Sequence, residues 1–187
     1  FNKENLDEKI INEIKEQIHY STGQIYLLCI GRLVKDKGLI ELVHVFLQLQ
    51  KKNVNLKLIL VGEYENALDP LPEATLLEIE NNTSIIHINW SNRVEYFMHL
   101  AHIMVHASYR EGFSNTLLQA GAMNCPIVCS AIDGNVDIVT DRETGILFQP
   151  GNTEDLTSKL SKALADLSVM KKYAEHLRVK VENNFSQ

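Results

Sequence analysis

Short, wholly apolar runs recur along the chain and alternate with longer segments in which apolar residues return every three or four positions. A run that is apolar at every position is typical of a strand in a parallel sheet covered on both faces. A return every three or four positions indicates an amphipathic helix. The pattern predicts strands at residues 25–30, 56–61, 85–88, 103–107, 127–130 and 146–148.

Helices are predicted between these strands and after the last one. Pro72 followed by Glu73 favours a helix start, and Leu76, Leu77 and Ile79 are expected to face inward. Strict alternation of strand and helix gives right-handed crossovers, so we expect an α/β fold: a Rossmann-like, doubly wound parallel sheet of about six strands with helices on both faces. The predicted helices cover residues 39–49, 72–79, 94–101, 116–123, 156–167 and 169–182.

The first part of the chain departs from this pattern. Residues 1–24 are highly charged, with apolar residues on one helical stripe, and we expect them to form an interdomain linker and an amphipathic helix. Residues 25–187 then form the domain itself. The chain also stops abruptly at Asn183-Asn184-Phe185-Ser186-Gln187, so we expect it to be a piece of a longer protein.

Composition and charge narrow the function classes. The 187 residues are 45% hydrophobic and 22% charged, as in a soluble globular domain. A formal net charge of −6 argues against nucleic acid or an anionic membrane as a general partner, because those surfaces need clustered Lys and Arg. No apolar run approaches the roughly 18 residues that span a bilayer, so we expect a cytoplasmic domain. The three cysteines are expected to be reduced and buried.

The segment from Glu111 to Gln119 puts a carboxylate before a small polar turn that opens an apolar helix. The first turn of a helix has unpaired N–H groups and a partial positive charge, so the backbone of Ser114, Asn115 and Thr116 could hold a phosphate. A carboxylate does not favour phosphate, and Glu111 is better suited to the hydroxyls of an attached sugar. The spacing therefore suggests a nucleotide-sugar site.

A second candidate loop runs from Gly31 to Gly38, between the first predicted strand and its helix. Arg32 can bind a phosphate with two parallel hydrogen bonds, and Lys37 adds a point charge. The alternative is a solvated loop with ordinary surface cations. Ligands of doubly wound sheets bind at the carboxyl ends of the strands, where this loop, Gly62 and Glu111 are all expected to lie.

A series of residues and short motifs along the chain carries a family resemblance. In chain order, they are Gly31-Arg32, Lys37-Gly38, Val61-Gly62, Ser108, Glu111-Gly112-Phe113, Ala120, Pro126-Ile127-Val128, Gly134, Thr144-Gly145 and Pro150-Gly151. In their order and spacing they resemble the C-terminal, donor-binding domain of family 4 glycosyltransferases with the GT-B fold. The resemblance extends from Ile25 to Leu167.

The resemblance implies a two-domain bacterial-type enzyme, in the hexosyltransferase class, that transfers a sugar from a nucleotide-diphosphate sugar with retention of anomeric configuration. Its acceptor would be a glycan or a lipid-linked glycan in the synthesis of a surface polysaccharide or glycolipid. The N-terminal domain, which carries most acceptor contacts and any peripheral contact with the inner face of the membrane, is absent from this chain. No metal cofactor is implied, and the isolated domain is expected to bind the donor without transferring the sugar.

The resemblance also assigns roles to residues. Arg32 and Lys37 would hold the diphosphate and neutralise the leaving group, and Glu111 would bind the donor sugar; these three form the catalytic set. The main chain of Ile88, Asn89 and Trp90 would meet the base. The full expected donor-binding set is Gly31, Arg32, Lys37, Gly62, Glu111, Gly112, Phe113, Ser114, Asn115, Thr116 and Gln119.

Among the positions that depart from the family pattern, two bear directly on the nucleotide site. Gln119 stands where the family has a second glutamate that accepts hydrogen bonds from the ribose; a glutamine oxygen still accepts, without charge assistance. Trp90 stands where glycine is common, and a buried structural tryptophan is favoured over one that shapes the base pocket. Gln119 keeps a non-catalytic nucleotide-binding or scaffold module open as an alternative.

A GT-B nucleotide-sugar epimerase is a further alternative, but the catalytic acids and histidines that it needs cannot be located in the sequence. His87, His99, His102 and His106 are expected to scatter, without metal-ligand spacing. Tyr109 and Arg110 are expected only to border the cleft.

Overall fold

The computed structural model describes residues 1–65 and 67–185. Its centre is a six-stranded sheet in the order β3-β2-β1-β4-β5-β6, with every pair of neighbours parallel. The predicted sheet is confirmed; the fourth strand ends one residue early because Ala107 already belongs to the loop that follows it. The strands are β1 (Ile25–Ile30), β2 (Leu56–Val61), β3 (Ile85–Ile88), β4 (Ile103–His106), β5 (Ile127–Ser130) and β6 (Ile146–Phe148).

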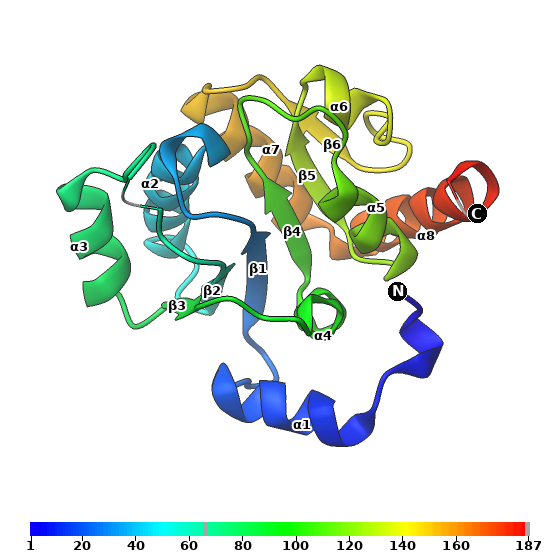
Figure 1. Ribbon diagram of the computed structural model, residues 1–187, viewed down its shortest axis with the longest axis horizontal. Helices are drawn as coiled ribbons and strands as arrows, with labels where there is room; N and C mark the ends of the chain where they lie inside the picture. Colours follow the sequence, from blue (N-terminus) through cyan, green and yellow to red (C-terminus); the bar gives the residue numbers. More distant parts are fainter. Residues whose placement is uncertain (66, 186–187) are drawn as a thin grey trace.

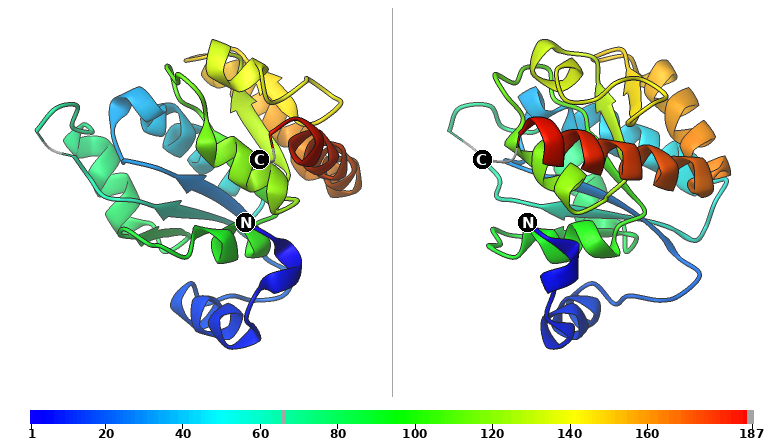
Figure 2. Two further views of the ribbon diagram at one scale, coloured as in Figure 1. Left: turned by 45° about the vertical axis from the view of Figure 1, so that its right-hand side comes forward. Right: turned by 90° about the vertical axis from the view of Figure 1, so that its right-hand side faces the viewer.

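Helices cover both faces of this sheet (Figure 1, Figure 2). One face carries α2 (Leu39–Gln50), α3 (Glu73–Asn81) and α7 (Thr153–Ala165). The other carries α1 (Glu8–Gln17), α4 (Val94–Leu100), α5 (Asn115–Ala122) and α8 (Leu167–Asn184). The sequence pattern does not predict α6 (Asp133–Val136) or the 3-10 helices η1 (Lys3–Asn5) and η2 (Lys35–Lys37), because such short turns show no helical period.

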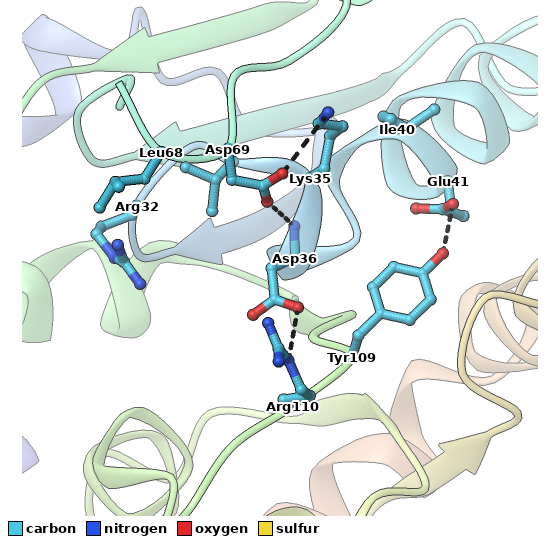
Figure 3. Close-up of a pocket in the computed structure, with 10 residues that line it drawn as sticks. Arg32, Lys35, Asp36, Ile40, Glu41, Leu68, Asp69, Tyr109 and Arg110 are labelled. Carbon is cyan, nitrogen blue, oxygen red and sulfur yellow. Dashed lines mark hydrogen bonds and ion pairs between the residues drawn. The ribbon is translucent and has the colours of Figure 1, made fainter. Parts of the chain in front are cut away.

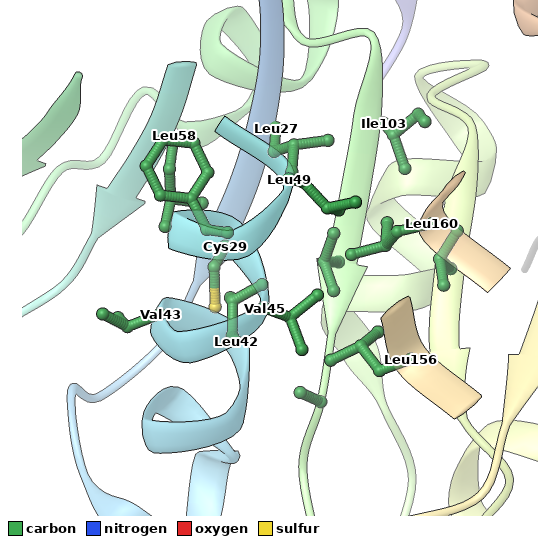
Figure 4. Close-up of a cluster of buried hydrophobic side chains, with 14 of the residues drawn as sticks. Leu27, Cys29, Leu42, Val43, Val45, Leu49, Leu58, Ile103, Leu156 and Leu160 are labelled. Atoms are coloured by element: carbon green, nitrogen blue, oxygen red, sulfur yellow. The ribbon is translucent and has the colours of Figure 1, made fainter. Parts of the chain in front are cut away.

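The core has two parts, one on each face of the sheet. Leu27 packs in the cluster that includes Leu42 of α2 and Leu160 of α7 (Figure 4). The next residue along β1, Leu28, points to the opposite cluster, with Phe97 of α4. Successive strand side chains alternate between the two clusters, which explains why the strands are apolar at every position.

One helix face differs from the expectation. Leu77 in α3 is 49% exposed, whereas Ile79 is buried, so the expectation that Leu77 faces inward is wrong. Leu76 lies three positions before Ile79 and packs against the same cluster, while Leu77 lies about 100° further round the helix. The inward face of this helix is therefore narrower than predicted.

The N-terminal amphipathic helix joins the same fold. In α1, Ile11 and Ile14 are buried, and the helix packs against α4, below the sheet in Figure 1. Helix α1 contributes Ile11 and Ile14 to the same core cluster as Leu28 and Phe97. The predicted boundary between residues 24 and 25 stays a prediction. No helix in the described part of the chain is long and apolar enough to cross a membrane.

The cysteines behave as the sequence predicts. Cys29, Cys125 and Cys129 are free and buried. Burial raises the pKa of Cys29 and of Cys125 to about 12, so these thiols stay protonated at neutral pH.

Candidate functional site

The loops that follow β1, β2 and β4 meet at the carboxyl edge of the sheet. Gly31 and Gly62 both have left-handed backbone conformations, with φ of 140° and 151°. A Cβ atom on Gly62 would lie 1.9 Å from the carbonyl oxygen of Gly31. Only glycine at position 62 lets the two loops come this close.

The loop after β1 is tied to the loop after β4 through one carbonyl group. The Asp36 carbonyl oxygen accepts hydrogen bonds from the Tyr109 amide at 2.9 Å and from Ser108 Oγ at 3.4 Å. Gly38 begins α2 with φ of 66°, and a Cβ there would lie 2.2 Å from the Ala107 carbonyl oxygen. These contacts bring Lys37 beside a residue 74 positions further along the chain, Glu111.

Buried polar groups support the Glu111 loop from below. Ser130 Oγ donates a hydrogen bond to the Ser108 carbonyl oxygen at 2.5 Å, and Asn135 Nδ2 donates to the Ser130 carbonyl oxygen at 2.9 Å. A Cβ on Gly134 would lie 2.6 Å from the Glu111 carbonyl oxygen. Helix α6 therefore packs directly under the loop, and this close packing requires glycine at position 134.

Glu111 is the centre of a compact ionic cluster. Lys37 Nζ lies 2.5 Å from Glu111 Oε1, and His106 Nε2 lies 3.2 Å from the same oxygen. The three side chains are 20%, 17% and 7% exposed for Lys37, Glu111 and His106. Burial raises the Glu111 pKa, but the hydrogen bonds and charges of His106 and Lys37 lower it more, to about 2. Glu111 is therefore a carboxylate throughout the physiological pH range.

His106 is the site residue that sequence reasoning missed. From the sequence, His106 is considered only as a possible metal ligand, whereas in the structure its Nε2 contacts Glu111 and lies 3.5 Å from Ser114 Oγ. A carboxylate only accepts hydrogen bonds, so Nε2 carries the proton that it shares with Glu111. His106 is the last residue of β4, and the following loop turns back over the strand end. Hydrophobic periodicity does not indicate that this loop turns back.

We expect the replacement His106→Leu to raise the Glu111 pKa from about 2 toward its ordinary value of 4.5, by roughly one unit. A folded-state pKa below the unfolded one stabilises the fold above pH 4.5, and this stabilisation disappears as the pH falls toward 2. The variant should therefore lose less stability between these pH values. Carbon-13 NMR titration of the Glu111 carboxyl measures the shift.

The internal control is Asp166, whose pKa is lowered by hydrogen bonds from Ser168 and Val169 at the start of α8. Its midpoint should not change in His106→Leu. An unchanged Glu111 midpoint in that variant would show that His106 does not stabilise the carboxylate.

Two of the hollows on this edge of the sheet bear on the predicted site. The first, here called the Glu111 hollow, has a volume of about 700 Å³, and its lining includes Arg32, Lys37, Glu111 and Gly112. The second, the Trp90 hollow, has a volume of about 270 Å³. Arg32 lines both, so the hollows adjoin at this residue. The predicted site residues in the Trp90 hollow are Gly31, Arg32, Gly62, Trp90 and Gln119.

Trp90 differs from the structural expectation. Its side chain is 70% exposed, so the expectation of a buried structural tryptophan is wrong. It follows β3, the edge strand of the sheet, where the chain has no further strand to pack against. The neighbouring Ile88 carbonyl oxygen accepts a hydrogen bond from the Gly62 amide at 2.9 Å, and Asn89 is exposed.

The remaining residues of the predicted donor-binding set, Phe113, Ser114, Asn115 and Thr116, do not line either of these two hollows. Ser114 caps α5 through its Oγ, and the Asn115 amide donates a hydrogen bond to the Phe113 carbonyl oxygen at 3.1 Å. Phe113 is 47% exposed, with its ring centroid 5.8 Å from that of Phe185. The turn that includes Thr116 is therefore not part of the lining of either hollow.

Both predicted cations are held by carboxylates. Arg32 forms an ion pair with Glu65, and the two side chains are 60% and 27% exposed. Lys37 is paired with Glu111. Exposed ion pairs contribute little to stability, so Arg32 can change partner at small cost. Within residues 1–65 and 67–185, no group of three His, Cys, Asp or Glu side chains is arranged to hold a metal ion.

The comparisons with known proteins agree on one family. The family model described as "Glycosyl transferases group 1" matches residues 10–179. The chain is 30% identical over its whole length to the capsular polysaccharide biosynthesis glycosyltransferase CapM of Staphylococcus aureus, covering 48% of that protein. The chain thus spans about half the length of this curated relative.

Solved structures share the fold. The C-terminal domain of the group 1 glycosyl transferase LpcC from Francisella tularensis is 23% identical, with a TM-score of 0.78 over 92% of each chain. Anabaena HepE, solved in complex with UDP-glucose, is 16% identical, with a TM-score of 0.83 over 100% of this chain and 52% of that one. The resemblance found in the sequence is confirmed: the chain belongs to the group 1 glycosyltransferase family and has the Rossmann-like fold of a GT-B C-terminal domain.

Proposed function

We propose that this chain is the donor-binding domain of a retaining glycosyltransferase of the hexosyltransferase class. The enzyme would transfer a sugar from a nucleotide-diphosphate sugar to a glycan or lipid-linked acceptor. The similarity to CapM, a capsular polysaccharide biosynthesis glycosyltransferase, supports a role in surface polysaccharide synthesis. The complex of HepE with UDP-glucose supports a nucleotide sugar as the donor.

The observation that carries this proposal is the contact of Lys37 with Glu111 in the Glu111 hollow, which adjoins the Trp90 hollow at Arg32. A nucleotide sugar consists of a nucleoside, a diphosphate and a sugar. The two hollows offer suitable side chains for these three parts in the same order. Trp90 and Gln119 lie where a base and ribose would fit, Arg32 lies at the junction, and Glu111 lies in the larger hollow. The diphosphate would therefore lie between Arg32 and Lys37.

Donor binding would exchange the partners of both cations. Arg32 would leave Glu65, and Lys37 would turn from Glu111 toward the diphosphate, where each forms charge-assisted hydrogen bonds. Negative charge builds on the nucleotide as its bond to the sugar breaks, so the two cations stabilise the transition state more than the ground state. Their position also explains why we expect no metal cofactor.

Glu111 would bind the donor sugar. Once Lys37 turns to the diphosphate, the carboxylate keeps the hydrogen bond from His106 and accepts others from sugar hydroxyls. His106 would therefore hold Glu111 in place while its other partner moves. Transfer itself needs the second domain, because closure between domains completes such a site, so the present chain should bind the donor without turnover.

Titration of this chain with UDP, GDP and their sugars tests the donor function. We expect one nucleotide diphosphate to bind with a dissociation constant in the millimolar range or below, and to raise the melting temperature. No binding of any of them at about 10 mM would overturn the proposal. We also propose that this domain lies in the cytoplasm and that the whole enzyme lies at the inner face of the membrane.

The replacement Gln119→Glu tests the ribose position. A charge-assisted hydrogen bond exceeds a neutral one by about 1 kcal/mol, so the variant should bind the nucleotide roughly fivefold more tightly. Isothermal titration calorimetry on both proteins measures the difference. Gln149→Glu provides a matched control, because this residue follows β6 and lies outside the described linings of both hollows. Equal affinity in Gln119→Glu and the original chain would show that Gln119 does not contact the ribose.

A further inference from the structure

A third hollow, here called the Tyr109 hollow, opens beside the Glu111 hollow and has a volume of about 670 Å³ (Figure 3). The two share Arg32, Asp36, Tyr109 and Arg110 in their linings, so they adjoin. In the placement proposed above, the nucleotide sugar lies in the Glu111 and Trp90 hollows, which leaves the Tyr109 hollow for another ligand. A ligand in the Tyr109 hollow would lie next to the donor sugar.

The Tyr109 ring is held rigidly at the wall of this hollow. Its hydroxyl donates a hydrogen bond to Glu41 Oε1 at 2.6 Å (Figure 3). Its amide donates to the Asp36 carbonyl oxygen at 2.9 Å. Burial and the Glu41 carboxylate raise the Tyr109 pKa to about 12, so the hydroxyl keeps its proton at neutral pH. Gly151 lies against the ring: a Cβ there would be 3.0 Å from Tyr109 Cε1.

This anchoring leaves a fixed aromatic surface toward solvent. Tyr109 is 37% exposed, and the half-buried Ile40 and the 79%-exposed Leu68 extend the apolar part of the lining. An aromatic ring that cannot turn loses little conformational entropy when a flat ligand packs on it. The apolar face of a pyranose ring is such a ligand.

The polar groups of the hollow come as charge pairs. Arg110 Nε lies 3.1 Å from Asp36 Oδ1, and Lys35 Nζ lies 3.7 Å from Asp69 Oδ1. Each pair presents hydrogen-bond donors and acceptors side by side. This arrangement suits sugar hydroxyls, since each hydroxyl both donates and accepts hydrogen bonds. Glu41 Oε2 is buried and has no hydrogen-bond partner among the described residues, so this end of the hollow lacks a donor.

We propose that the Tyr109 hollow is an acceptor subsite, in which a sugar ring of the acceptor glycan packs on Tyr109 and hydrogen-bonds to Asp36 and Arg110. The inference rests on the proposed donor function, since an acceptor must lie beside the donor sugar. It assigns part of acceptor recognition to this domain, in addition to the contacts expected from an N-terminal domain.

Amide NMR of this chain tests the subsite, with maltotriose and N,N′,N″-triacetylchitotriose as probes, each added with and without saturating UDP. We expect at least one saccharide to shift the amides of Glu41, Tyr109 and Arg110, with a dissociation constant of about 1–20 mM. Tyr109→Ala should weaken that binding at least about tenfold and leave the UDP affinity within about twofold. Tyr109→Phe keeps the ring and should retain most of the binding.

Phe1→Ala, which removes another exposed aromatic residue, serves as the control and should bind the saccharide normally. Arg110→Ala adds a variant that cannot disturb the fold, because this side chain is 83% exposed; it should also weaken saccharide binding. Absence of saccharide binding, or binding that Tyr109→Ala leaves unchanged, would overturn the subsite. Failure of UDP to bind the unaltered chain would instead overturn the donor function, and the two outcomes are read from separate titrations.

Discussion

Replacing Arg32 and Lys37 together with alanine should weaken the binding of UDP, or of whichever nucleotide diphosphate the chain prefers, at least about 100-fold. A hydrogen bond to a charged group contributes about 1.5–3 kcal/mol, and the double variant loses two such groups. It also leaves Glu111 without its lysine partner, so a 17%-exposed carboxylate would then face the diphosphate and repel it. Isothermal titration calorimetry at constant ionic strength measures the loss.

Lys51→Ala with Lys52→Ala is the matched control. It removes the same net charge at the opposite end of α2, where both lysines are exposed. Binding should change less than about twofold, because exposed charges that far away are screened by salt. If the Arg32 and Lys37 double variant also retained its affinity, the diphosphate would not lie between these residues.

A large loss of stability is expected from Gly38→Ala, at about 3 kcal/mol of destabilisation. Gly38 has φ of 66°, and a Cβ there would lie 2.2 Å from the Ala107 carbonyl oxygen, a backbone atom that cannot move aside without shifting the loop after β4. For a chain of this size, such a loss lowers the melting temperature by roughly 6–12 °C. Thermal and urea unfolding measure it.

Gly23→Ala separates backbone strain from the steric clash. Gly23 also has a left-handed backbone, with φ of 95°, but a Cβ there would meet nothing within 4 Å. This variant should lose only about 1 kcal/mol, the cost of the backbone conformation. Equal destabilisation by the two variants would show that the close approach of Gly38 to Ala107 does not matter.

The sheet could be predicted because its strands are short apolar runs that end at clear stops. Ile25–Ile30 and Leu56–Val61 are each followed by a glycine that must adopt a left-handed backbone conformation. The inward face of α3 could not be predicted as easily. Leu77 is as apolar as its neighbour Leu76, and only the direction from which the sheet approaches decides which of the two is buried.

The candidate site was predictable in part. Arg32 and Lys37 stand out because they are charged residues that follow a predicted strand. Glu111 and Gln119 stand out because their segment opens a predicted helix. His106 does not stand out, since a histidine at the end of an apolar strand looks like a core residue until the following loop folds back over it.

The remaining site features depend on tertiary packing. The buried Ser108, Ser130 and Asn135 network has no sequence signature, because its hydrogen bonds join β5 to the loop after β4 and to α6. The exposure of Trp90 likewise follows from the edge position of β3, which the sequence does not reveal.

The central claim is that a nucleotide-diphosphate sugar lies across the two adjoining hollows, with its diphosphate between Arg32 and Lys37. Amide NMR of the nitrogen-15-labelled chain, titrated with the preferred nucleotide diphosphate, tests this most directly. We expect the largest shifts at Gly31, Lys37, Gly112 and Gln119, at the carboxyl edge of the sheet. Shifts confined to the opposite edge, near α1, or no shifts at any concentration up to about 10 mM, would contradict the claim.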